Sequence, residues 1–171
     1  RGLGDVYKRQ VLSCKKLMSK GDNMAKENTT IHNSRNIFFV FQNKTYKQES
    51  EGGFLWAPKE NKKGQKFGHW RLMAEINKND IIIHCANKQI KAISVAKADV
   101  YEDNKPSTFE TDWEEKGWKV DCEYLVIPHP IDMTDHRDKL FTLQPKENGP
   151  LNKEHKGKQG YLFVANTKML E

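Results

Sequence analysis

Apolar residues fall into two patterns typical of strands in the first half of the chain. Residues 36–42 form a short β-branched and aromatic run that is apolar on both faces, which predicts a central strand. Residues 80–101 hold two apolar runs joined by the turn-prone letters ANKQ, which predicts a β-hairpin. In the second arm of this hairpin one face is formed by Ile90, Ala92, Ser94 and Ala96.

Helical spacing appears in two segments. In residues 69–76, Trp70, Met73 and Ile76 recur on one helical face, so we expect a helix that packs this face on the sheet. Residues 133–143 predict a second short helix, with Thr134 as the candidate N-cap.

The second half of the chain predicts two more strands. Alternation in 117–127 indicates a strand that Pro128 and Pro130 are expected to end, and residues 161–165 indicate a last strand. Between residues 99 and 123 nine acidic residues stand against three basic ones, so a solvated loop is predicted around Trp113. The pattern gives five or six short strands with two or three short helices. It therefore predicts an α+β fold, a small barrel-like arrangement rather than repeated βαβ units.

Length and cysteine content narrow the class of protein. A chain of 171 residues can bury a core as one domain without disulfides or metals. Its three cysteines are an odd number at wide spacing, so neither a disulfide framework nor a zinc site is expected. No apolar run approaches the roughly 18 residues that span a bilayer. The sequence therefore predicts a reduced, cytoplasmic protein without a membrane segment, a metal or another cofactor.

The formal net charge of +6 is concentrated at the N-terminus. Residues 1–35 contain eight Lys and Arg against three Asp and Glu, whereas residues 36–171 contain 21 against 20. Because the rest of the chain is nearly neutral, global basicity gives little evidence for a nucleic-acid partner. Any such argument depends on local patches.

The two ends of the chain differ from the middle. Residues 1–33 are polar and without apolar periodicity, so they are expected to be disordered. Residues 1–10 resemble the translation of a sequencing adapter, which places the native start near Met18 or Met24. We expect the folded domain over 34–167, and residues 168–171 as the start of a truncated helix or linker that Asn166 or Thr167 caps.

Catalytic chemistry finds little support in the sequence. The six histidines are scattered, and the chain contains no GxSxG, HExxH, P-loop or GxGxxG motif. His84 and Cys85 are neighbours on a predicted strand, so their side chains point to opposite faces and cannot form a nucleophile–base pair. Cys85 is expected to be a buried core residue, and the chain is expected not to be an enzyme.

Tryptophans and lysines suggest binding instead. Trp56 and Trp113 lie in stretches predicted as polar loops, where a core does not need them. Aromatic faces of this kind stack on an exposed nucleobase, and nearby lysines bind phosphates. Two lysine clusters are available for that role, one of Lys59, Lys62, Lys63 and Lys66 and one of Lys153, Lys156 and Lys158. Edge packing of the indoles and a solvated lysine loop remain the structural alternatives.

Five blocks in one order resemble a known family. They are NIFFVFQNKTY from residue 36, GGFLWAP from 52, HWRLMAEINKNDIIIHCANKQIKAISVA from 69, GWKVDCEYLVIPHPI from 117 and KQGYLF from 158. Together they resemble the EVE domains of the PUA-like superfamily, related to YTH and ASCH domains, in the variant fused to restriction-type nuclease and ATPase modules. The resemblance implies a small, distorted β-barrel with flanking helices. It also implies a reader that holds a modified base in an aromatic pocket and performs no chemistry itself.

The resemblance also implies roles for individual residues. Trp56 corresponds to one wall of the pocket and Trp113, or less closely Trp118, to a second wall. Ala57 follows Trp56 where YTH relatives carry a hydroxyl residue, a departure from the adenine-type contact set. The implied pocket comprises Trp56, Ala57, Ser94, Trp113, Trp118 and Tyr161. The residues beside this pocket that we expect to contact the nucleic-acid backbone are Lys59, Lys62, Lys63, Lys66, His69, Lys153, Lys156, Lys158 and Gln159, with a cap at the start of its helix as the alternative role of His69.

The leading hypothesis is therefore that the protein is a bacterial reader of modified double-stranded DNA. It would be the specificity module of a modification-dependent restriction system, and a nuclease or ATPase would be the effector of that system. Methylated or hydroxymethylated cytosine and N6-methyladenine are the ligands considered. The alternative is an RNA-binding or small-molecule-binding regulatory domain on the same barrel.

Overall fold

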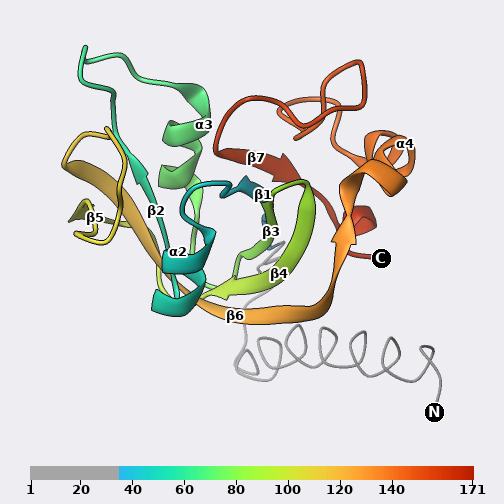
Figure 1. Ribbon diagram of the computed structural model, residues 1–171, viewed down its shortest axis with the longest axis horizontal. Coiled ribbons are helices and arrows are strands. Elements are labelled where there is room, and N and C mark those ends of the chain that lie inside the picture. The colour runs from blue at the N-terminus through green and yellow to red at the C-terminus, as the bar shows by residue number, and fades with distance from the viewer. Residues whose placement is uncertain (1–34) are drawn as a thin grey trace, which may run out of the picture. The chain divides into compact units, whose positions relative to one another are not determined.

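The computed structural model describes residues 35–171, and the segment 1–33 that the sequence predicts to be disordered lies outside the described residues. Asn36 to Glu171 form one compact unit. The unit is a curled seven-stranded mixed sheet with short helices, which confirms the predicted α+β fold (Figure 1). The strand order is β2-β6-β4-β3-β1-β7, and β5 pairs with the start of β6 on the side opposite β2.

The strands and helices follow one another along the chain, with the longest connection between α4 and β7. The strands are β1 (Ile37–Phe41), β2 (Phe54–Pro58), β3 (Ile81–Ala86), β4 (Gln89–Ala96), β5 (Tyr101–Asn104), β6 (Lys116–Asp132) and β7 (Leu162–Ala165). The helices are α2 (Tyr46–Gly52), α3 (Gly68–Arg71) and α4 (Met133–Leu143), with 3₁₀ turns η1 (Leu72–Glu75) and η2 (Thr167–Met169).

The first predicted strand is confirmed as a central one. β1 runs parallel to β3 on one side and antiparallel to β7 on the other, and its first four residues are buried. The predicted hairpin is also confirmed, because β3 and β4 pair antiparallel. Asn87 and Lys88 at its turn both have positive φ, 53° and 63°. A two-residue turn with positive φ at both positions matches the twist of antiparallel strands.

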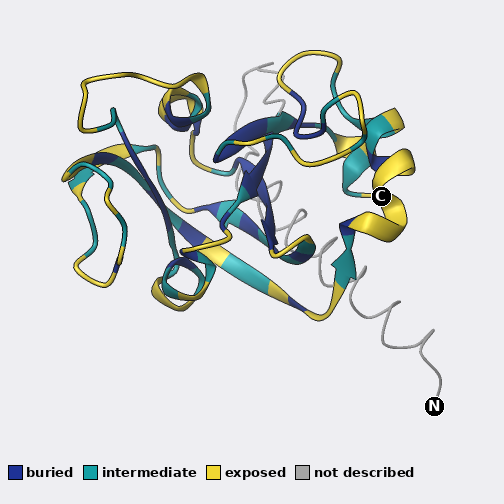
Figure 2. Cartoon of the chain, turned by 45° about the horizontal axis from the view of Figure 1, so that its top comes forward, coloured by how far each residue is buried: buried dark blue, intermediate teal, exposed yellow. Residues whose placement is uncertain are grey.

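The buried faces of β4 and of the 69–76 segment contribute to the core. β4 alternates intermediate and buried residues along its whole length, as the sequence pattern predicts. Trp70, Met73 and Ile76 are buried, so the predicted face of the 69–76 segment packs on the sheet. That segment is not one helix, because a four-residue α-helix passes directly into a 3₁₀ turn. Figure 2 shows the buried residues concentrated on the strands and the exposed residues on loops and the outer side of α4.

The prediction that Pro128 and Pro130 end a strand is wrong. β6 continues from Lys116 to Asp132, along the lower edge of the sheet in Figure 1. Its pairing with β4 passes from Val126 opposite Ala92 to Ile131 opposite Ile90, and the register shifts between them. Both prolines lie in the extra β6 residues at this irregularity, where a missing N–H breaks no ladder hydrogen bond.

Two further predictions need correction, and one helix was not predicted. The 99–123 segment is not only a loop, because β5 forms at Tyr101–Asn104 and pairs with the start of β6. Asp132, not Thr134, caps α4, since the Asp132 carboxylate accepts a hydrogen bond of 2.7 Å from the Thr134 N–H. The sequence reading also missed α2. At the C-terminus, the Asn166 side chain accepts from the Met169 N–H and caps η2, one of the two caps predicted.

Candidate functional site

Four aromatic side chains from distant parts of the chain meet beside β2. Trp56 and Trp113 lie nearly parallel, with ring centroids 6.1 Å apart and an interplanar angle of 21°. Phe109 stands edge-on to Trp56 at 5.9 Å and to Trp113 at 6.1 Å. Tyr161 stands edge-on to Trp113 at 6.4 Å. We call Trp56, Phe109, Trp113 and Tyr161 the aromatic cluster.

Trp56 is a fixed part of this cluster. It lies in β2, opposite Lys119 of β6, and its side chain is fully buried, so the prediction that it lies in a polar loop is wrong. Its indole Nε1 donates to the backbone carbonyl of Asp103 at 3.3 Å. A Cβ at Gly117 would come within 2.3 Å of the Trp56 ring, so only glycine leaves room for the indole there.

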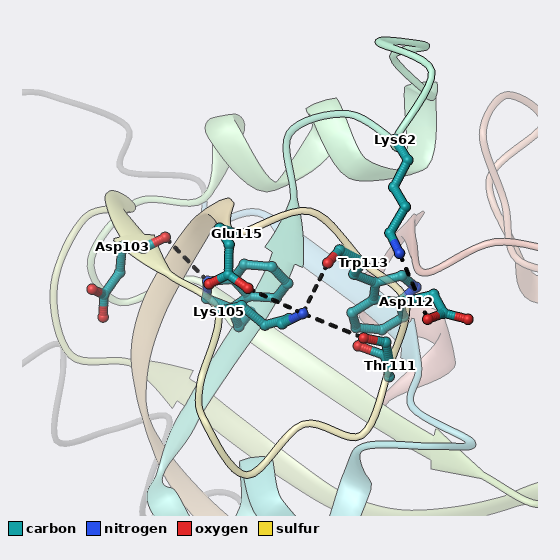
Figure 3. A network of polar contacts seen from close by, with 8 residues as sticks. Lys62, Asp103, Lys105, Thr111, Asp112, Trp113 and Glu115 are labelled. Carbon is teal, nitrogen blue, oxygen red and sulfur yellow. Dashed lines mark hydrogen bonds and ion pairs between the residues drawn. The ribbon is translucent and has the colours of Figure 1, made fainter.

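Trp113, in contrast, lies on a loop that a single lysine holds together. Figure 3 shows Lys105 reaching across the loop from β5, with Trp113 in front of the strands. The Lys105 ammonium donates to the carbonyls of Trp113 and Thr111 at 3.0 and 3.3 Å, and it pairs with Glu115 at 3.3 Å. The Trp113 side chain is half-buried. The second aromatic wall is therefore positioned by the loop's own contacts rather than by a strand.

The spacing of the two indoles has a direct consequence for binding. Stacked aromatic carbons lie about 3.5–4 Å apart, so a flat ring between two indoles needs about 7 Å from centroid to centroid. The observed 6.1 Å is shorter, which means that the cluster is closed. A planar ligand can stack on Trp56 only if the Trp113 ring moves outward or is displaced from Trp56.

A buried carboxyl group lies directly behind Trp56. Glu49 of α2 is fully buried and accepts four hydrogen bonds. Its donors are the Trp56 N–H at 2.8 Å, the Thr45 hydroxyl at 2.7 Å, the Gln42 amide at 2.5 Å and the Tyr161 hydroxyl. Burial raises the pKa of Glu49 to about 7 even though these donors favour the ionised form. Glu49 thus ties β2 and the start of β7 together beneath the aromatic cluster.

The same network extends to the centre of the sheet. His84 is fully buried between Gln42 Oε1 and Ser94 Oγ, each 2.7 Å from a ring nitrogen. The Gln42 amide nitrogen donates to Glu49 and to the Tyr124 hydroxyl, so its oxygen accepts from His84 Nδ1 and the Ser94 hydroxyl donates to Nε2. Burial lowers the pKa of His84 to about 3, which keeps the ring neutral. Cys85 is also buried, and burial raises the pKa of its thiol to about 12.

Of the six pocket residues that the resemblance implies, the structure brings three together. Trp56, Trp113 and Tyr161 belong to the aromatic cluster. Ser94 does not reach it, because its hydroxyl is fully buried against His84.

Ala57 and Trp118 lie on the other side of β2. They pair with each other across β2 and β6, one position along from Trp56, and neighbouring strand residues point to opposite faces. Ala57 is fully buried in the core, and the Lys59 ammonium lies 4.2 Å above the Trp118 ring.

The lysines and neighbouring residues implied for backbone contact fall into two groups. Lys59, Lys66 and His69 line a cavity of about 630 Å³ together with Arg71, Glu75 and Trp118. Lys156, Lys158 and Gln159 line a second cavity of about 670 Å³. The remaining three, Lys62, Lys63 and Lys153, are exposed and line neither cavity.

His69 connects the first cavity to the aromatic cluster. Its Nδ1 accepts a hydrogen bond of 3.1 Å from the Tyr161 N–H, and partial burial lowers its pKa. A neutral His69 therefore holds the start of β7 in place. This contact leaves its other ring nitrogen as the group available to a ligand.

Sequence reasoning missed Glu49, Phe109 and Lys105. Glu49 lies in the polar letters YKQESE, which carry no sign of burial, and Phe109 is an isolated apolar residue in an acidic segment. Lys105 is one lysine among many. Within residues 35–171 no group of His, Cys, Asp or Glu side chains could hold a metal ion. Over the same residues, no helix has the length and apolar character to cross a membrane.

Comparisons with known proteins agree on the fold. Neither a family model nor a curated protein matches the chain. Among solved structures, the Pho92 YTH domain in complex with m6A matches with a TM-score of 0.51 at 14% identity, covering 83% of this chain and 82% of that one. A Pseudomonas putida protein matches at 0.51 with 12% identity over 78% of this chain and 94% of its own. A hypothetical protein from Leishmania major matches at 0.51 with 6% identity, over 80% and 90%. At these identities the likenesses show a shared fold.

Proposed function

We propose that this chain is a reader of modified nucleobases of the EVE type, which takes a flipped-out base onto Trp56. The observation that carries the proposal is the pair of near-parallel indoles 6.1 Å apart, one fixed in a strand and one on a loop. The indole of Trp56 keeps its position, and the indole of Trp113 can move with its loop. A planar base can therefore enter between them and be stacked on both sides. The fold shared with a YTH domain solved in complex with m6A supports the same reading.

Binding would proceed by exchange of stacking partners. The base leaves the duplex, Trp113 moves outward, and the base stacks between Trp56 and Trp113 while Phe109 and Tyr161 close the sides. Each base–aromatic stack contributes about 1–3 kcal/mol, which offsets the unstacking of the base from its neighbours. Because Glu49 holds the backbone of Trp56 and the ring of Tyr161, these two walls keep their places during the exchange.

A polar contact to the base edge is available from the loop. Among the described residues, Thr111 Oγ1 is the buried side-chain polar atom without a hydrogen-bond partner. Thr111 lies two positions before Trp113 on the segment that Lys105 holds. A hydroxyl can donate to or accept from a base edge, so this group would acquire a partner when a base enters.

The proposed partner is modified double-stranded DNA, and the proposed context is the specificity module of a bacterial modification-dependent restriction system. Both rest on the resemblance of the five sequence blocks to EVE domains fused to nuclease and ATPase modules. In that context the chain itself has no catalytic role, and cleavage belongs to the effector. Lysines beside the aromatic cluster would bind the flanking phosphates, so affinity falls as salt rises.

The test is a fluorescence-anisotropy titration of the full chain. It uses matched duplexes carrying cytosine, 5-methylcytosine, 5-hydroxymethylcytosine, adenine or N6-methyladenine, together with the same sequences as RNA. We expect one modified duplex to bind more tightly than its unmodified partner. Trp113→Ala should remove roughly fivefold to a hundredfold of that preference, the equivalent of one stack.

Trp118→Ala is the matched variant, because it removes an indole from the other face of the same strands. It should keep the ratio of modified to unmodified affinity. Equal binding of all duplexes by the wild type would contradict the proposal. Preferential binding of a modified RNA would support a base-reading function but identify RNA, not DNA, as the partner. Loss of the preference in Trp118→Ala alone would place the base pocket on the opposite face of β2 and β6.

A further inference from the structure

A strongly basic cavity lies at the start of α4 and at the chain segment that leads into Tyr161 of the aromatic cluster. It measures about 670 Å³ and opens between the β3–β4 turn, the start of α4 and the loop that precedes β7. Its lining includes five side chains that are or can become cationic, and among the described residues no Asp or Glu lines it. These five are Lys88, Arg137, His155, Lys156 and Lys158. We call this the basic cavity.

Four cations of the basic cavity form no ion pair with the surrounding protein. Within residues 35–171, Lys88, Arg137, Lys156 and Lys158 form none of the observed ion pairs, which are all made by other lysines or by His155. Lys158 donates to the backbone carbonyl of Gly149 at 2.7 Å, a contact that leaves its charge uncompensated.

Two carboxylates act on these cations without forming ion pairs, since Lys88 helps to lower the pKa of Asp132 and Arg137 helps to lower that of Asp138. The carboxylate of Asp132 caps α4, and the carboxylate of Asp138 bonds His155 Nδ1 at 2.6 Å. Four unpaired cations around one cavity repel one another, and an anion removes that repulsion.

The basic cavity and the aromatic cluster share a wall. Gly160 and Phe41 line the cavity, and Gly160 is the chain neighbour of Tyr161. The Phe41 N–H donates to the Tyr161 carbonyl at 2.8 Å, while the Tyr161 ring stands edge-on to Trp113. The cavity and the aromatic cluster are therefore linked through the backbone of residues 160 and 161.

The opposite side of the cluster is much less basic than the sequence predicts. Lys59 pairs with Glu102, and Lys62 lies 3.7 Å from Asp112. Lys105 and Lys119 pair with Glu115 and Asp103 in the same region. A polyanion that lies across the aromatic cluster meets partly neutralised lysines on that side and unpaired cations on the side of the basic cavity.

We infer that the basic cavity binds the phosphates of the nucleic-acid strand that carries the read base, with Arg137 and Lys88 as contacts that neither the lysine clusters nor the resemblance identified. The inference rests on the proposed function for its ligand. Arg137 presents a planar fork that matches phosphate oxygens, and Lys88 projects from the two-residue turn of the hairpin. Their contacts position the strand and carry no information about the base.

The experiment measures affinity and its salt dependence in the full chain with Lys88→Glu, Arg137→Glu and the double variant. The probes are the preferred modified duplex and its unmodified partner, at salt concentrations from about 50 to 200 mM. We expect each single variant to weaken binding of both probes about tenfold or more at the lowest salt. The slope of log affinity against log salt should fall by about one per variant and about two in the double variant. The ratio of modified to unmodified affinity should stay unchanged.

Lys139→Glu is the matched control. It makes the same charge change on the same exposed helix, two residues beyond Arg137, and Lys139 does not line the cavity. If Lys139→Glu and Arg137→Glu weaken binding equally, only net charge matters and the inference fails. An unchanged affinity in the double variant, or no binding of either probe by the wild type, also overturns it. If the wild type binds both probes equally while Arg137→Glu and Lys88→Glu weaken both, the phosphate site stands and the base-reading function fails.

Discussion

The buried Glu49 carboxyl makes the pH dependence of stability a sharp test of the network beneath the aromatic cluster. Its pKa is about 7 in the folded protein against an ordinary value of 4.5. The folded state therefore holds a proton between about pH 4.5 and 7 that the unfolded state has released. Stability from this group is fully present below about pH 4.5 and is lost as pH rises toward 7. A pKa difference of about 2.5 corresponds to about 3 kcal/mol.

His84 acts in the opposite direction over part of the same range. Its pKa is about 3 in the folded protein against an ordinary 6.5, so the unfolded state takes up a proton first as pH falls. Stability from His84 is present above about pH 6.5 and declines toward pH 3. Between about pH 4.5 and 6.5 the contributions of Glu49 and His84 oppose each other at about 1.4 kcal/mol per pH unit. Because the two contributions cancel in this range, the pH dependence of the wild-type unfolding free energy reveals neither of them.

Glu49→Gln separates the two contributions. The glutamine keeps an oxygen for two of the donors and cannot titrate, while His84 is unchanged. We expect the free energy of unfolding of the variant, relative to wild type, to rise by about 3 kcal/mol from pH 4.5 to pH 7.5. The assay is urea denaturation of both proteins at several pH values in that range. A difference between the two proteins that stays constant with pH would refute the assignment of a raised pKa to Glu49.

Three smaller predictions concern the parts that hold the site. Gly117→Ala should destabilise the fold by about 1–3 kcal/mol in urea denaturation, because the new Cβ would lie 2.3 Å from the Trp56 ring; an unchanged midpoint would contradict this packing. Lys105→Met should expose the indole of Trp113 to acrylamide quenching while the unfolding midpoint moves little, and unchanged quenching would show that the loop does not depend on this lysine. Asp132→Ala should cost about 1 kcal/mol through loss of the α4 cap, measurable by thermal unfolding.

Local pattern was sufficient for much of the fold. The β-branched run of β1, the alternation of β4 and the helical spacing of Trp70, Met73 and Ile76 each reflect a period that neighbouring residues impose on one another. The hairpin turn at Asn87 and Lys88 is equally local, since the two residues tolerate the positive φ that the turn requires. These features could be predicted because their cause lies within a few residues of sequence.

The site was predicted only in part, because its members are brought together by strand pairing. The sequence indicated Trp56 and Trp113 as unusual, but it placed Trp56 in a loop, and the resemblance favoured Trp113 for the second wall while keeping Trp118 as the alternative. The register of β2 on β6 separates them, since Trp118 pairs with Ala57 and so faces away from Trp56. A shift of one residue in that register would exchange the two faces.

What the sequence by itself determined is the set of strands with a clear period and the chemical types available for a site, four tryptophans and two lysine clusters. What only the tertiary structure decided is which charges remain unpaired and which polar groups are buried. Glu49 carries no sequence sign of burial, yet contacts from the chain neighbourhoods of residues 42, 56 and 161 enclose it. Burial and ion pairing depend on distances between residues far apart in sequence. Those distances exist only after the sheet has closed, because each strand then fixes the neighbours of the others.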